Sequence, residues 1–310
     1  MPKPIEIAVV SGKGGTGKTV LTACLAALIE DKVVADCDVD APDLHLLLRP
    51  SIRREEAFSG NQRATIDAEM CTSCGKCLEV CRFKAIVAAG ESGDETYHVD
   101  SLDCEGCGVC TWSCPVGAIT MEDTQGGKWF VSDTRFGTLV HASLGVAEEN
   151  SGKLVTIVRS EARKVAIETG HRLVFIDGPP GVGCPVIASI AGVDLAVVVT
   201  EPTLSGLHDL ERVLGLTRHF GVRTGVVVNK YDLNGEVCLQ ILEFLRINRV
   251  PLLGRIPFDT MVNRAVAAGK TVVEYSDSKV AREIRFASEQ MMDLIRKEQG
   301  ARAAEAPKEC

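Results

Sequence analysis

The chain has 310 residues, of which 45% are hydrophobic and 25% charged, and its formal net charge is −8. This length suits one large domain or two domains. Nucleic acid is disfavoured as a main partner, because neutralising phosphates needs clustered Lys and Arg. No stretch approaches 18 uninterrupted apolar residues, which excludes a membrane-spanning helix. The first residues lack the apolar region and cleavage site of a signal peptide, so we expect a cytoplasmic protein.

Short apolar runs predict the strands of a buried sheet. Residues 5–10 are apolar and β-branched, a glycine-rich loop follows at 11–17, and a helix then begins near Lys18. Further strand-like runs occupy residues 33–36, 173–177, 195–201, 224–229 and 252–258. Helical segments lie between several of these runs. The alternation predicts an α/β fold, with a mostly parallel sheet covered by helices on both faces.

A cysteine-dense segment, residues 63–123, interrupts this alternation. Two similar cysteine runs begin at Cys71 and Cys104, 33 residues apart, and each precedes a short apolar stretch. Such an internal repeat indicates an inserted α+β domain, with residues 91–95 as a hairpin loop. The α/β domain would then comprise residues 1–62 and 124–300. Residues 301–310 are small and polar, which predicts a disordered tail.

The glycine-rich loop matches the phosphate-binding pattern G-x-x-x-x-G-K-[ST] in full. Glycines let backbone N–H groups approach phosphate oxygens, and the following helix directs its positive N-terminus at the anion. Lys18 is expected to reach the β- and γ-phosphates, and the Thr19 hydroxyl to bind Mg²⁺. The residues expected to bind nucleotide here are Gly12, Lys13, Gly14, Gly15, Thr16, Gly17, Lys18 and Thr19.

With Lys13, the loop resembles the deviant Walker A motif K-G-G-x-G-K-T of the MinD/Mrp/ParA ATPases, relatives of the nitrogenase iron protein. The resemblance implies a P-loop ATPase fold, ATP hydrolysis and a nucleotide-dependent dimer. In that dimer Lys13 would cross to the partner's nucleotide; a solvated loop lysine is the alternative reading. Residues 36–40 resemble the family's switch I, which implies that Asp38 orients water or the Mg²⁺ shell. Residues 175–181 resemble switch II, with Asp177 beside Mg²⁺ through water.

Two further segments concern the nucleotide base. Residues 229–232 formally match the N-K-x-D pattern that reads guanine in GTPases. The MinD-like family instead uses an asparagine at this strand end against adenine, which implies a base contact for Asn229. Residues 256–259 resemble the family's I-P-x-D loop and suggest Pro257 and Asp259 as base-side residues. ATP is favoured over GTP on this resemblance alone.

Both cysteine runs have the C-x2-C-x2-C-x3-C spacing of bacterial ferredoxins, in which the fourth cysteine ligates the other cluster. One expected [4Fe–4S] cluster therefore takes Cys71, Cys74, Cys77 and Cys114. The other takes Cys81, Cys104, Cys107 and Cys110. Zinc is the alternative, because C-x2-C pairs also bind it, but zinc does not explain two four-cysteine runs.

One arginine beside the first run and five cysteines outside both runs complete the picture. Arg82 replaces the proline that follows the fourth cysteine in the ferredoxin pattern, and we expect its charge to raise a cluster's potential. Cys184 follows switch II, where a role as a ligand between subunits stays open. The remaining thiols are expected to be ordinary core or tail residues, namely Cys24, Cys37, Cys238 and Cys310.

The insert enters after switch I and returns before switch II, whose loops respond to the γ-phosphate in this class of protein. The leading hypothesis is an ATPase with two [4Fe–4S] clusters whose nucleotide state controls electron transfer to a partner protein. One alternative is a cluster carrier or assembly ATPase of Mrp type. The other is a MinD-like positioning or scaffold ATPase with sensor clusters. Expected cofactors are ATP, Mg²⁺ and the clusters. Expected partners are a second ATPase subunit, identical or related, and a redox or cluster-acceptor protein.

Overall fold

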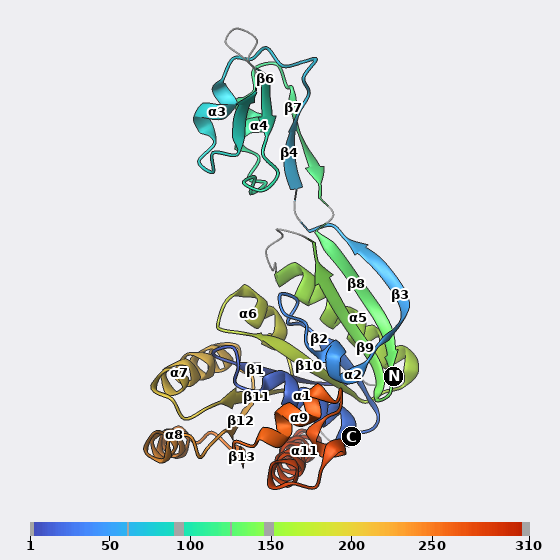
Figure 1. Cartoon of the computed structure of the whole chain (residues 1–310), viewed down its shortest axis with the longest axis vertical. Helices are drawn as coiled ribbons and strands as arrows, with labels where there is room; N and C mark the ends of the chain where they lie inside the picture. Colours follow the sequence, from blue (N-terminus) through green and yellow to red (C-terminus); the bar gives the residue numbers. More distant parts are fainter. Residues whose placement is uncertain (1–2, 61, 90–95, 125, 146–151, 306–310) are drawn as a thin grey trace. The chain divides into compact units, whose positions relative to one another are not determined.

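The computed structural model describes residues 3–60, 62–89, 96–124, 126–145 and 152–305 (Figure 1). The chain divides into two compact units. The main unit comprises Met1–Glu55, Trp129–Ser143 and Asn150–Cys310, and the cysteine unit comprises Glu56–Lys128 and Leu144–Glu149. The predicted insert, residues 63–123, lies inside the cysteine unit, whose bounds are wider on both sides.

A nine-stranded sheet with the order β13-β12-β11-β1-β10-β2-β9-β8-β3 forms the main fold. Its six neighbouring strands from β13 to β2 are parallel, as the alternation of strands and helices predicted. All six coincide with predicted apolar runs to within a few residues. Their bounds are β1 (Ile5–Ser11), β2 (Lys32–Asp36), β10 (Leu173–Pro180), β11 (Leu195–Thr200), β12 (Thr224–Asn229) and β13 (Leu252–Ile256).

Three further strands of the sheet were not predicted: β3 (Ser51–Phe58), β8 (Gly127–Thr134) and β9 (Gly137–Leu144). β9 continues the sheet in parallel beside β2. A two-residue turn joins β8 to β9. We expected strand–helix alternation to resume directly after the insert, and this prediction was wrong for residues 127–144. β3 was missed because most of its residues are exposed and it mixes charged with apolar side chains, unlike a buried strand.

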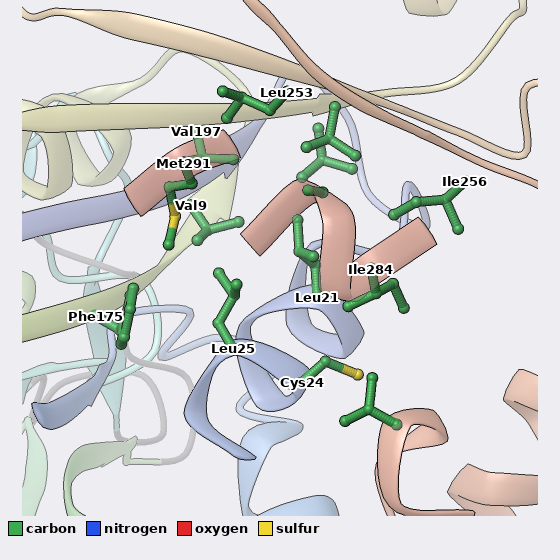
Figure 2. Close-up of a cluster of buried hydrophobic side chains, with 14 of the residues drawn as sticks. Val9, Leu21, Cys24, Leu25, Phe175, Val197, Leu253, Ile256, Ile284 and Met291 are labelled. Carbon is green, nitrogen blue, oxygen red and sulfur yellow. The ribbon is translucent and has the colours of Figure 1, made fainter. Parts of the chain in front are cut away.

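The core beside the phosphate loop packs α1 and α11 against the sheet (Figure 2). In β1, Ile7 and Val9 contribute to this cluster, and they alternate with Ala8 and Val10, which are equally buried. Because alternate side chains of a strand point to opposite faces, β1 is covered on both faces. Replacing a fully buried large side chain such as Phe175 with Ala would cost about 3–5 kcal/mol.

Nine helices are assigned in the described part of the main unit. The last, α11, ends at Glu305, so five residues of the predicted disordered tail are helical, as their Ala, Arg and Glu content favours. Residues 306–310 lie outside the described residues. The helices are α1 (Lys18–Leu28), α2 (Leu44–Leu48), α5 (Gly152–Thr169), α6 (Cys184–Ile190), α7 (Leu204–His219), α8 (Gly235–Ile247), α9 (Thr260–Ala267), α10 (Val272–Tyr275) and α11 (Lys279–Glu305).

The cysteine unit is built from two copies of a strand–helix–strand repeat. The first copy is β4 (Gln62–Ile66), α3 (Lys76–Val80) and β5 (Ile86–Ala89); the second is β6 (Thr96–Val99), α4 (Val109–Ser113) and β7 (Ile119–Asp123). α3 and α4 begin 33 residues apart, as do β5 and β7. A glycine with φ of 74° precedes each helix, Gly75 and Gly108. The predicted hairpin loop, residues 91–95, lies outside the described residues.

The strands of the two repeats pair across the repeat boundary. β4 pairs antiparallel with β7, and β5 pairs antiparallel with β6, so each two-stranded sheet takes one strand from each copy. Ala64, Cys77, Ile86 and Ile119 form the small buried core of this unit. Across the described residues of the whole chain, no helix has the length and apolar character needed to span a bilayer.

Candidate functional site

The phosphate loop, residues 12–17, connects β1 to α1 at the carboxyl edge of the parallel strands. Gly15 and Gly17 have φ of 76° and 91°, a region that L side chains rarely adopt. A Cβ on Gly17 would lie 2.3 Å from the Asn229 amide nitrogen, and a Cβ on Gly12 would lie 2.4 Å from the Asp209 Cβ. The loop therefore needs these glycines, and it leaves the N–H groups at the start of α1 available for an anion.

Three parallel strands bring Lys18, Asp38 and Asp177 together. The Lys18 Nζ lies 3.0 Å from Asp38 Oδ2 and 3.9 Å from Asp177 Oδ1. Lys18 begins α1, Asp38 follows β2, and Asp177 lies in β10, which pairs with both β1 and β2. The Thr22 hydroxyl donates to Asp177 Oδ1 at 2.9 Å, and Thr19 lines the same cavity as Asp38. The residues predicted to bind phosphate and magnesium therefore lie next to one another.

Burial governs the electrostatics of this group. Desolvation lowers the pKa of Lys18, but the carboxylates of Asp177 and Asp38 outweigh it and raise that pKa overall. Desolvation raises the pKa of Asp177 despite the opposing Lys18 charge. In Asp36, burial and then the Asp177 charge raise the pKa well above its ordinary value. The site therefore holds more carboxylates than its one ammonium can neutralise.

A buried carboxylate oxygen in this group has no partner among the described residues. Asp177 Oδ2 makes no hydrogen bond, although Asp177 is fully buried. An unsatisfied buried oxygen is costly, and a bound cation would satisfy it. Carboxylate and hydroxyl oxygens are the ligands that Mg²⁺ prefers. Asp177, Thr19 and Asp38 therefore fit a magnesium site, with the excess negative charge of the group favouring the cation.

Two cavities meet at the phosphate loop. One, of about 530 Å³, is lined by loop residues 14–19, by Asp38 and Asp40, and by Pro179 and Pro180 after Asp177. The other, of about 210 Å³, is lined by Asn229, Lys230 and residues 256–259. Gly15 and Gly17 line both cavities. The first has the surroundings that a triphosphate needs, and the second is apolar enough for a base.

The predicted base-side residues line the second cavity, but two of them also make hydrogen bonds within the fold. The Asn229 amide donates to the Thr16 carbonyl at 2.7 Å, which ties β12 to the phosphate loop. Asp259 caps α9 by accepting from the Met261 N–H at 2.8 Å. Pro257 lines the cavity without such a bond. Phe258, which sequence reasoning did not select, lines it as well and is 51% exposed, so its ring can take a stacked base.

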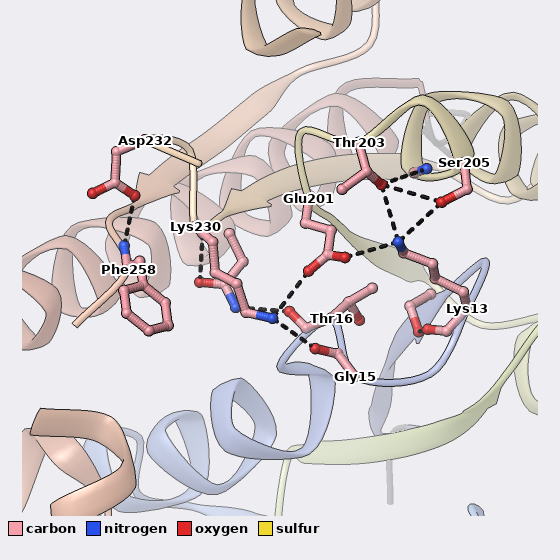
Figure 3. A network of polar contacts seen from close by, with 12 residues as sticks. Lys13, Gly15, Thr16, Glu201, Thr203, Ser205, Lys230, Asp232 and Phe258 are labelled. Carbon is pink, nitrogen blue, oxygen red and sulfur yellow. Dashed lines mark hydrogen bonds and ion pairs between the residues drawn. The ribbon is translucent and has the colours of Figure 1, made fainter. Parts of the chain in front are cut away.

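Lys13 is held by residues of its own chain (Figure 3). Its ammonium lies 2.8 Å from Glu201 Oε1 and donates to the hydroxyls of Thr203 and Ser205 at 3.0 and 3.1 Å. Glu201 also pairs with the Lys230 Nζ at 3.0 Å, and Lys230 donates to the Gly15 carbonyl at 3.0 Å. These contacts return to the phosphate loop, so a change there can alter how Lys13 is held.

Sequence reasoning missed the residues that hold Lys13: Glu201, Thr203, Ser205 and Lys230. Burial raises the pKa of Glu201, but the two lysines outweigh it and lower that pKa overall. One signal was available, because three polar side chains follow β11 where it ends at the same sheet edge as the phosphate loop. The contacts themselves join residues about 190 positions apart and leave no local pattern.

Eight cysteines of the cysteine unit line two small cavities, four around each. Cys71, Cys74, Cys77 and Cys114 line one, beside Tyr97 and Gly75. Cys81, Cys104, Cys107 and Cys110 line the other, beside Phe83 and Glu105. Each set combines three cysteines of one repeat with the last cysteine of the other, the grouping expected from the ferredoxin spacing. The Ala118 N–H donates to the Cys114 sulfur at 3.3 Å.

This grouping does not by itself make a metal centre. Among the described residues, no group of three or more His, Cys, Asp or Glu side chains stands as it would around a metal ion. The clusters therefore stay a prediction. The Arg82 guanidinium carbon lies 5.9 Å from the centre of the Phe83 ring, which lines the second cavity. Of the other thiols that the structure describes, Cys184 is exposed, and Cys24, Cys37 and Cys238 are buried.

Comparisons with known proteins extend over most of the chain. The model of the CobQ/CobB/MinD/ParA nucleotide binding domain family matches residues 7–272. An uncharacterised protein of Methanocaldococcus jannaschii is 34% identical over 297 residues, which cover 94% of this chain and 98% of that protein. An uncharacterised ATP-binding protein of the same organism is 26% identical over 286 residues, covering 90% of this chain and 84% of that protein.

Solved structures show the same fold. The cell division ATPase MinD of Pyrococcus furiosus aligns with a TM-score of 0.56 and 21% identity, covering 94% of this chain and 99% of that one. MinD of Pyrococcus horikoshii, complexed with Mg-ADP, aligns with a TM-score of 0.55 and 18% identity, covering 94% and 97%. At these identities the likeness concerns the fold alone.

Proposed function

The chain belongs to the CobQ/CobB/MinD/ParA nucleotide-binding family and is a P-loop ATPase, and we propose that its cysteine unit makes it an iron–sulfur ATPase. In this proposal, the nucleotide state of the main unit controls electron transfer from the cysteine unit to a partner protein. The observation that carries the proposal is the crossed grouping of eight cysteines around two cavities. A MinD-type ATPase has no need of that arrangement for nucleotide binding.

For the nucleotide we propose roles that follow from the site's contacts. The backbone N–H groups of the phosphate loop bind the phosphates of ATP, and bound Mg²⁺ supplies charge neutralisation on the phosphate oxygens. When the γ-phosphate is present, Lys18 exchanges its contact with Asp38 for a phosphate oxygen. Asp38 can then accept a hydrogen bond from the attacking water. Asn229, Pro257 and Asp259 form the base side, with ATP preferred over GTP.

For the cysteine unit we propose two [4Fe–4S] clusters with the ligand sets given above. Thiolates are the usual ligands of these clusters, which supply one-electron chemistry when bound. Mononuclear zinc is less favoured, because it needs only four ligands and does not explain two four-cysteine runs. A cluster spreads its four cysteines over four irons, which suits cysteines placed around a cavity rather than around a point.

The chain connections support coupling between nucleotide and clusters. From Asp38, the chain passes through α2 and β3 into the cysteine unit, and it returns through β8, β9 and α5 to Asp177 in β10. Both acidic residues of the nucleotide site thus lie on segments that lead to or from that unit. Loops that respond to the γ-phosphate can therefore transmit a change along the backbone. A nucleotide-dependent dimer, with itself or a related ATPase, is part of the proposal.

A second candidate function is a cluster carrier or assembly ATPase of Mrp type. One cysteine of each set, Cys74 and Cys107, is exposed, which would let an acceptor thiol reach a cluster. The third candidate, a MinD-like positioning ATPase, draws on the MinD structures that share the fold. It leaves the cysteine unit as a sensor only.

The test uses the full chain, reconstituted anaerobically with iron and sulfide. About eight irons and eight sulfides per chain, without zinc, are expected. The cluster potentials measured with ATP and with ADP should differ by about 30 mV or more, which corresponds to a roughly threefold change in the ratio of ATP to ADP affinity between the oxidation states. Equal potentials with both nucleotides, together with cluster transfer to an apo-ferredoxin, would favour the carrier instead. Zinc incorporation without iron would reject both.

A further inference from the structure

A groove of about 780 Å³ lies at the edge of the sheet opposite the phosphate loop. It is lined by the first residues of β1 and β10, the last residues of α1 and α5, and part of α11. β1 leads from Ile5 in the groove to Ser11 at the loop, and a strand of that length spans roughly 20 Å. The groove has the volume of a small-molecule site, and none of its lining residues belongs to the nucleotide site.

The floor of the groove is apolar. Leu173 and Ile295 are buried in it, and Ile167, at its surface, is 39% exposed. Four further apolar lining residues are partly buried and pack on the core: Ile5, Leu28, Ile29 and Met292. Concave apolar surface open to solvent marks a place where another apolar group binds.

Positive side chains stand at the rim. Lys3, Arg172 and Arg296 line the groove, with side-chain exposures of 56%, 81% and 68%. These three cations are more exposed than the apolar floor, and none of the lining residues is Asp or Glu. Asp31 pairs with Arg172, Asp293 pairs with Arg296, and Glu6 lies 3.9 Å from the Lys3 Nζ, all three acids outside the lining. The exposed pairs of Arg172 and Arg296 contribute at most about 1 kcal/mol each, so an anionic ligand can compete for these two cations.

We infer that this groove binds an anionic amphiphile, with a single apolar chain on the floor and a carboxylate or phosphate head at the rim. The apolar floor excludes a fully polar anion. A peptide strand is disfavoured because β1 and β10 are each paired on both sides and offer no free backbone edge. The arginines of the rim disfavour a cationic amphiphile, because the groove lining itself holds no acid to pair with it. The inference does not depend on the clusters or on electron transfer.

Isothermal titration of the full chain tests the inference with two probes of equal chain length, dodecanoate and dodecyltrimethylammonium, both below their micellar concentrations. Dodecanoate should bind saturably with one site per chain, and the cationic probe about tenfold more weakly or not at all. Equal binding of both probes, or no saturable dodecanoate binding, would overturn the inference. Binding to vesicles of anionic phospholipid without binding of free dodecanoate would also overturn it, in favour of a membrane-surface contact.

Two variants with matched controls locate the site. Ile167→Asp should weaken dodecanoate binding about tenfold or more, because bound dodecanoate would cover the new carboxylate with its apolar chain. Leu239→Asp, an equally polar change at an exposed position of α8, should not. Arg296→Gln should weaken binding about threefold. Arg246→Gln should leave it unchanged, although Arg246 is likewise exposed and paired with an acid three residues earlier. All four should retain ATPase activity, which shows that they fold; equal loss in controls and test variants would place the ligand elsewhere.

Discussion

The Lys18 ammonium lies 3.0 Å from Asp38 Oδ2, and both side chains are nearly buried. Because Lys18 is the only cation in contact with this group of carboxylates in the described structure, we expect Lys18→Ala to lower ATP hydrolysis at least about 100-fold. The visible absorption of reconstituted clusters should persist, since no cysteine is touched. Lys164→Ala, an exposed change on α5, serves as the control. Loss of absorption together with hydrolysis would contradict independent folding of the two sites.

Lys13 is held by Glu201, Thr203 and Ser205, and it does not line the cavity that loop residues 14–19 border. We expect Lys13→Ala to leave nucleotide affinity within about threefold, because none of the other loop contacts is lost. Turnover and ATP-dependent dimerisation should both fall, as measured by phosphate release and light scattering. Turnover equal to that of the unaltered chain would exclude the role of Lys13 across a dimer interface.

Glu6 is fully buried and accepts from Arg159 at 3.0 and 3.1 Å and from Arg163 at 2.6 Å. Burial raises the pKa of Glu6, but Arg159 and then Arg163 outweigh it and lower the pKa below its ordinary value of 4.5. The ion pair therefore stabilises the fold above the unfolded pKa. This contribution is lost as the pH falls through the lower, folded pKa.

We expect Glu6→Gln to lower the free energy of unfolding at pH 7 by about 3 kcal/mol. This loss of stability is at the low end for a broken buried ion pair, because Arg159 still donates hydrogen bonds to the carbonyls of Ala188 and Ala191. Urea unfolding followed by circular dichroism at pH 7 and near pH 4 measures it. The difference between the two proteins should shrink at the lower pH. A difference that grows there would reverse the assigned sign; Glu243→Gln, on the surface, is the control.

The crossed grouping of cysteines makes a quantitative prediction for iron content. Cys71→Ser with Cys114→Ser alters one cavity, so about four irons should remain after reconstitution. Cys71→Ser with Cys104→Ser alters both cavities and should leave few or none. Cys238→Ser, a buried thiol outside the unit, controls for general loss of cysteine. Equal iron in the two double variants would reject the crossed ligand sets.

The parts of the fold that sequence predicted are those with local patterns. β1, the glycine loop and α1 follow from an apolar run, a complete motif and leucines at helical spacing. The cysteine spacing likewise anticipated which four cysteines surround each cavity. For β1, the loop and α1, neighbouring residues determine the arrangement. In the cysteine unit, neighbouring residues place three cysteines of each set, and pairing between the repeats brings the fourth.

The parts that sequence missed depend on distant contacts. β8 and β9 pair within the large sheet, although their mixed side chains look like those of a surface hairpin. The contact between Lys13 and Glu201 joins two ends of neighbouring strands and has no signature in either segment. Asp259 shows a related limit, since its motif suggested a base contact while its carboxylate also caps α9.

The strand exchange in the cysteine unit bears on how such a unit can be shortened or have originated. A polypeptide containing only one repeat would have a single strand of each two-stranded sheet and three of the four cysteines around one cavity. It could complete either only by associating with a second copy of itself. The unit therefore has the architecture of a dimer of two similar repeats joined in one chain. Both cavities are gained or lost together when a repeat is added or removed.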